Sequence, residues 1–70
     1  MNNDDCLNAA ASIAGAWGCE ITPWVDGRGA TIEGNNKKMR GQLRMCGFKV
    51  GEGFLMAWTA VYFYPEDAEL

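Results

Sequence analysis

The feature that most limits how this chain can fold is the apolar run Phe54–Tyr64, which alternates as a β-strand would. Large apolar side chains would occupy both faces of such a strand: Phe54, Met56, Trp58, Ala60, Tyr62 and Tyr64 on one, Leu55, Ala57, Val61 and Phe63 on the other. A strand that is apolar on both faces normally lies in the middle of a sheet and is covered on both sides. The run therefore predicts a central strand, which follows a tight connection at residues 51–53 and ends at Pro65.

Residues 4–16 have the spacing of a helix, in which Asp4 or Asp5 caps the first turn and Gly18 ends the last. The helix is apolar nearly all round, and only a thin polar stripe remains. Full coverage is hard to achieve in a small domain, so residues 7–17 could face a second copy of the chain or another partner. The alternative is that the alanines here are simply tolerated at the surface.

Residues 19–25 alternate as a strand, and Pro23 predicts that this strand lies at a sheet edge because proline cannot donate to the ladder. The turn sequence 26–29 then leads into a returning strand at 30–33, with Ile32 pointing inward.

Residues 36–46 favour a second helix, with Met39, Leu43 and Cys46 on one apolar stripe and Gly47 after its last turn. The competing interpretation is a long strand over 39–50. The four elements together predict an α+β fold of the form helix–hairpin–helix–hairpin. Its three- or four-stranded, mostly antiparallel sheet would be packed by the two helices. We expect residues 1–70 to form one such domain, with a loose acidic C-terminal tail.

The residue types argue against catalysis. The chain has no histidine, the usual general acid–base near neutral pH. Its three cysteines, Cys6, Cys19 and Cys46, are too few and too irregularly spaced for a zinc site or a disulfide framework. We therefore expect a protein that is not an enzyme, carries no metal or cofactor, and keeps its cysteines reduced.

The N-terminus is acidic and polar, unlike a secretory signal, and no apolar run is long enough to cross a membrane. We expect a cytoplasmic protein with no membrane partner.

The charges are segregated along the sequence, although the net charge is only −3. All six basic residues lie between Arg28 and Lys49, whereas acids concentrate at the two ends. The terminal acids are Asp4, Asp5, Glu66, Asp67 and Glu69. If the ends meet, these carboxylates form one patch that could occupy a basic groove on a partner, with Trp24 as an apolar anchor. The alternatives are that the acids only aid solubility and that a helix covers Trp24.

A second candidate surface is the basic face of the second helix, formed by Lys37, Lys38, Arg40 and Arg44. It would bind an anion such as nucleic acid at the helix N-terminus, or it is an ordinary solvated face. Direct nucleic-acid binding is the weaker hypothesis, because such proteins are expected to be basic overall.

In its small size, its lack of catalytic residues, its segregated charge and its ending Tyr-Phe-Tyr-Pro-Glu-Asp-Ala-Glu-Leu, the chain resembles the phage-encoded anti-CRISPR proteins. The resemblance implies a non-enzymatic inhibitor that blocks a nucleic-acid or partner surface on a CRISPR effector complex, such as a type I surveillance complex. It also implies that the protein acts in the cytoplasm of the bacterial host.

Overall fold

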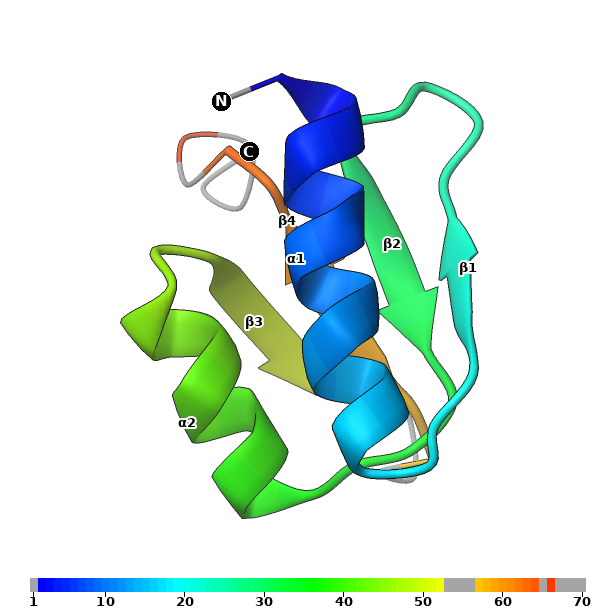
Figure 1. Ribbon diagram of the computed structural model, residues 1–70, viewed down its shortest axis with the longest axis vertical. Helices are drawn as coiled ribbons and strands as arrows, with labels where there is room; N and C mark the ends of the chain where they lie inside the picture. Colours follow the sequence, from blue (N-terminus) through cyan, green and yellow to red (C-terminus); the bar gives the residue numbers. More distant parts are fainter. Residues whose placement is uncertain (1, 53–56, 65, 67–70) are drawn as a thin grey trace.

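The secondary structure alternates one helix with two strands, twice over (Figure 1). The computed structural model describes residues 2–52, 57–64 and 66. The elements are α1 (Asn3–Ala16), β1 (Ile21–Pro23), β2 (Gly29–Ile32), α2 (Lys37–Met45), β3 (Lys49–Glu52) and β4 (Thr59–Tyr62).

The four strands form one antiparallel sheet in the order β1-β2-β4-β3. Both helices pack on the same face of this sheet (Figure 1). The predicted α+β class with a mostly antiparallel sheet is therefore confirmed. β1 lies at one edge, as Pro23 predicted, although the strand is shorter than the expected 19–25.

Helix α1 begins one residue earlier than predicted because its cap is Asn2. The Asn2 side chain accepts a hydrogen bond from the Asp5 amide, so the prediction that Asp4 or Asp5 is the cap was wrong. The helix presents Cys6, Ala10 and Ala14 to the sheet, all of them buried. These small side chains let the helix backbone approach the sheet closely.

Helix α2 confirms the helical interpretation of residues 36–46 over the long strand. Asn36 caps it, and Met39 and Leu43 are fully buried as predicted. Cys46, however, is exposed, so it does not continue the predicted apolar stripe. Gly47 has a φ of 96° and reverses the chain, so that Phe48 donates its amide proton to the Leu43 carbonyl and is itself buried beside the helix end.

The strand predicted over Phe54–Tyr64 is only partly observed. β4 begins at Thr59, with Ala57 and Trp58 before it, while Phe54–Met56 lie outside the described residues. Gly51 and Glu52 belong to β3 and not to the tight connection that was expected.

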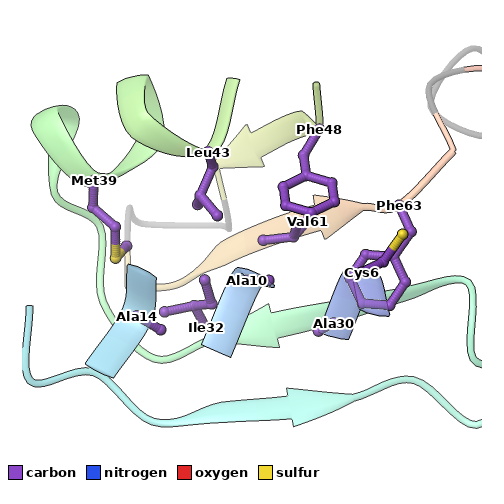
Figure 2. Close-up of a cluster of buried hydrophobic side chains, with 10 residues drawn as sticks. All are labelled: Cys6, Ala10, Ala14, Ala30, Ile32, Met39, Leu43, Phe48, Val61 and Phe63. Carbon is purple, nitrogen blue, oxygen red and sulfur yellow. The ribbon is translucent and has the colours of Figure 1, made fainter. Parts of the chain in front are cut away.

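β4 is central, as predicted, but the described helices cover only one of its faces. On that face Val61 and Phe63 join Ala30 and Ile32 of β2 in the hydrophobic core (Figure 2). No described helix covers the other face, where Ala60 is buried and Tyr62 is partly exposed, so the expectation of burial on both faces is confirmed only in part.

Candidate binding surfaces

Asn3 joins three parts of the chain at one end of the molecule. Its side-chain oxygen accepts a hydrogen bond from the Tyr64 hydroxyl, just beyond β4. Its amide nitrogen lies so close to the β1–β2 turn that a Cβ on Gly27 would come within 2.9 Å of it. The Arg28 guanidinium in turn lies 4.5 Å from the centre of the Tyr64 ring. The start of α1, this turn and the end of β4 therefore meet.

The meeting brings exposed carboxylates from the two ends of the sequence to the same end of the fold. Asp4 and Asp5 occupy the first turn of α1, and Glu66 follows Tyr64 by two residues. All three are exposed, and we call them the acidic end. The other two predicted acids, Asp67 and Glu69, lie outside the described residues.

Trp24 lies on the side of the sheet away from both helices, so the alternative in which a helix covers it is wrong for the described chain. Its indole N–H donates to the Thr31 hydroxyl at 2.9 Å, and its ring meets the Tyr62 ring edge-on, with 5.1 Å between centroids. The ring lies over Gly29, where a Cβ would come within 2.5 Å of the indole. Glycine is required here because any side chain would displace the ring. Trp24 is therefore held in one position while remaining partly exposed.

The strand register defines the rest of this face, on which no described helix lies. Thr31 lies opposite Thr22 and Ala60, and Tyr62 lies opposite Gly29 and Lys49. We call the residues that share this side the outer face: Thr22, Trp24, Gly29, Thr31, Lys49, Gly51, Ala60 and Tyr62. The described residues in its middle have small side chains, and Trp24 and Tyr62 lie in contact at one end, both partly exposed. Tyr62 was not singled out from the sequence, although its alternation with Val61 would have placed it on this side.

The predicted basic face is smaller in the structure than in the sequence. Lys37, Lys38 and Arg44 are exposed, but Arg40 is only 7% exposed and does not belong to that surface. Arg40 lies three residues from the buried Leu43, which separates the two side chains by only about 60° around the helix, and so it still faces inward. In addition, the Asn36 side chain accepts the amide protons of Lys38 and Met39. The expected anion site at this helix N-terminus therefore loses two of its donors.

The acidic end and the start of α2 lie at opposite ends of the molecule. α1 and α2 run in opposite directions along the sheet, so Asp4 and Lys37 are far apart (Figure 1). Lys37 and Lys38 are therefore separated in space from the acidic end, whereas Arg28 lies within that end, against the Tyr64 ring.

Much of the predicted partner-facing segment 7–17 is used inside the fold. Leu7 and Ile13 pack against the core, and the Trp17 indole N–H donates to Gln42 of α2. The residues of this segment that are most exposed are Asn8, Ser12 and residues 15–17. A homodimer through residues 7–17 stays a prediction.

Cys6 is buried, Cys19 is half-buried and Cys46 is exposed, and all three are free thiols. Within residues 2–52, 57–64 and 66, no three Cys, Asp or Glu side chains are grouped so that they could hold a metal ion. Neither α1 nor α2 is long and apolar enough to span a bilayer.

Comparison of the chain with protein-family models, with curated proteins and with solved structures found no match.

Proposed function

We propose that this chain is a non-catalytic inhibitor that binds a protein target through Trp24, Tyr62 and the adjacent acidic end. The observation that carries the proposal is the pair of rings in contact on the face that no described helix covers. Thr31, Gly29 and the edge-on contact fix Trp24 before any partner arrives.

Tryptophan and tyrosine are the residues that most often dominate the energy of protein interfaces. A ring that is already fixed loses little conformational freedom on binding, so more of its contact energy appears as affinity. Both rings are partly exposed, so part of their surface is available to a partner.

The acidic end would orient the protein toward its target and raise the rate of association. Asp4, Asp5 and Glu66 lie next to the β1–β2 turn that carries Trp24, while Lys37 and Lys38 lie at the far end. The exposed acids at this end would pair with cations on a basic surface, and complementary charge raises the association rate more than the final affinity. The target we propose is a basic, nucleic-acid-holding surface of a CRISPR effector complex, in line with the resemblance to anti-CRISPR proteins.

The partner is tested by size-exclusion chromatography of the protein with purified type I surveillance complexes. We expect co-elution with one of them and a loss of guide-directed DNA binding by that complex. If the protein elutes separately from every complex tested, this partner class is wrong.

The surface is tested with two variants of equal charge change. We expect D4N/D5N to slow association with the complex and to weaken its salt dependence. E20Q/E33Q, which neutralises two exposed acids beyond the other end of β1 and β2, serves as the matched control and should behave as the parent protein. Equal effects of the two variants would remove the acidic end from the proposal.

The other function predicted from sequence, a nucleic-acid-binding regulator, has less support. Arg40 is buried and Asn36 occupies the amide donors at the start of α2. Retention of DNA or RNA in a gel shift at low salt, lost in K37E/K38E, would favour it over the inhibitor.

A further inference from the structure

β3 is an edge strand with one unpaired side, and the adjoining surface is hollow and basic. In the described sheet β3 pairs with β4 alone. Beside it, between β3 and the end of α2, lies an open cavity of about 430 Å³. The described residues that line the cavity are Arg44, Gly47, Phe48, Lys49 and Val50.

The hydrogen-bond pattern of the sheet shows which backbone groups of β3 face outward. The Phe63 amide donates to the Arg28 carbonyl, so Phe63, and with it Val61 and Thr59, directs its backbone groups toward β2. The alternate residues Tyr62 and Ala60 therefore bond to β3.

Tyr62 lies opposite Lys49, and Ala60 lies opposite Gly51. The backbone N–H and C=O of Val50, between these two, consequently point away from β4 to the open edge. An extended peptide can pair with such groups and add a strand to the sheet.

Charge selects what kind of peptide fits. Arg44 and Lys49 are both exposed, and the described lining of the cavity has two cations and no acid. Side chains alternate along a strand, so a peptide residue opposite Val50 would point toward α2 and Arg44. Its neighbours would point to the other side, where Lys49 lies opposite Tyr62. Acidic side chains at either set of positions would thus lie near a cation.

We propose that the β3 edge binds an extended acidic segment of a partner protein by strand addition. Main-chain hydrogen bonds to Val50 would supply the pairing, and Arg44 and Lys49 would select carboxylates. This surface is separate from the outer-face aromatic pair, and the inference does not depend on the inhibitor proposed above.

The probe is an acetylated, amidated hexapeptide of alternating valine and glutamate, titrated into isotope-labelled protein and followed by NMR. We expect amide shifts centred on residues 48–50 and slower hydrogen exchange at the Val50 amide. The matching valine–lysine peptide should bind about ten-fold more weakly, because the ion pair with Arg44 or Lys49 is replaced by a repulsion.

Two charge-reversal variants compare the cations beside the β3 edge with the cations at the start of α2. R44E/K49E should lose at least about ten-fold in affinity for the glutamate peptide and gain affinity for the lysine peptide. K37E/K38E changes the net charge by the same amount at the other end of the helix and should bind as the parent does. Equal losses in both variants would overturn the proposal.

A separate control tests whether main-chain hydrogen bonds hold the peptide. The glutamate peptide N-methylated at every residue keeps its charges but loses the N–H donors of all six residues, so it should fail to bind. If it binds as well as the unmodified peptide, or if inorganic phosphate alone produces the same shifts, the edge is an anion site and not a strand acceptor. The Val50 amide shift is also measured without peptide at several protein concentrations. If it changes with concentration, the edge binds a second copy of the chain, which would contradict a separate partner.

Discussion

The two faces of the sheet are built from the same strands but differ in what their side chains do. Toward the helices, Ile32 and Val61 are aliphatic and fully buried. Toward the outside, Trp24 and Tyr62 are aromatic, partly exposed, and fixed by a hydrogen bond and a ring contact. Because side chains alternate along a strand, β2 and β4 can supply the core with one set of residues and a binding surface with the next.

We expect the helix side of the sheet to contribute most of the folding free energy. The outer face should contribute the binding free energy of the proposed function. Full burial of a large aliphatic side chain contributes about 1.5–3 kcal/mol, whereas one hydrogen bond contributes about 0.5–1.5 kcal/mol net. Substitutions on the helix side should therefore act mainly on the free energy of unfolding, and those on the outer face mainly on binding.

The largest effect is expected for Ile32→Ala on the helix side. Removing a fully buried isoleucine side chain should lower the free energy of unfolding by about 2–5 kcal/mol. A domain of this size has roughly 4–10 kcal/mol in total, so the variant should be close to unfolding. Urea denaturation followed by circular dichroism measures the change. Val25→Ala, at a fully exposed position, is the control and should differ from the parent by less than about 0.5 kcal/mol.

Gly29→Ala should have the next largest effect, because the added methyl group would clash both with a side chain of the outer face and with the backbone of β4. The new Cβ would lie 2.5 Å from both the Trp24 ring and the Val61 carbonyl oxygen. We expect a loss of about 1–3 kcal/mol in the free energy of unfolding, with displacement of the indole and weaker partner binding.

Gly41→Ala is the matched substitution in α2, where nothing lies within 4 Å of the added Cβ. It should stabilise the protein by up to about 1 kcal/mol, since alanine is the better helix former. If both glycine variants shift stability in the same direction, the close approach of Trp24 to Gly29 is wrong.

Thr31→Val tests the outer face alone, because it keeps the side-chain shape and removes the acceptor of the Trp24 indole N–H. The free energy of unfolding should fall by about 0.5–1.5 kcal/mol. The indole N–H resonance of Trp24 should move, and its exchange with water should become faster. An unchanged indole resonance would show that the hydrogen bond does not form in solution.

The smallest effect on folding is expected for D4N/D5N at the acidic end. Both carboxylates are exposed in the first turn of α1, where each contributes about 0.3 kcal/mol through the helix dipole, so the free energy of unfolding should fall by about 0.6 kcal/mol. The same variant should nevertheless slow association with the partner. A large loss of stability without any change in association rate would show that the acidic end contributes to folding and not to binding.

Sequence patterns were sufficient where local chemistry decides the structure. Pro23 placed β1 at an edge, Gly47 marked the end of α2, and the spacing of Met39 and Leu43 predicted the buried side of that helix. Each of these depends on the residue itself or on neighbours within one helical turn.

Features that depend on distant parts of the chain were missed. Arg40 lies at the margin of the apolar stripe, where burial is decided by what packs against α2 and not by helical spacing. The site around Trp24 depends on Gly29, Thr31 and Tyr62, and the last of these comes beside it only through the pairing of β2 with β4. The N-caps of both helices could have been predicted from the local sequence, because Asn2 and Asn36 lie directly before the two helices.

The most direct test of the division between the two faces is hydroxyl-radical footprinting of the protein, free and bound to its partner complex. The oxidisable side chains report on both sides: Trp24 and Tyr62 lie on the outer face, whereas Trp17 and Met45 belong to the ends of the helices. We expect binding to protect Trp24 and Tyr62 from oxidation and to leave Trp17 and Met45 unchanged. Protection of Trp17 and Met45, with Trp24 and Tyr62 still reactive, would contradict the account.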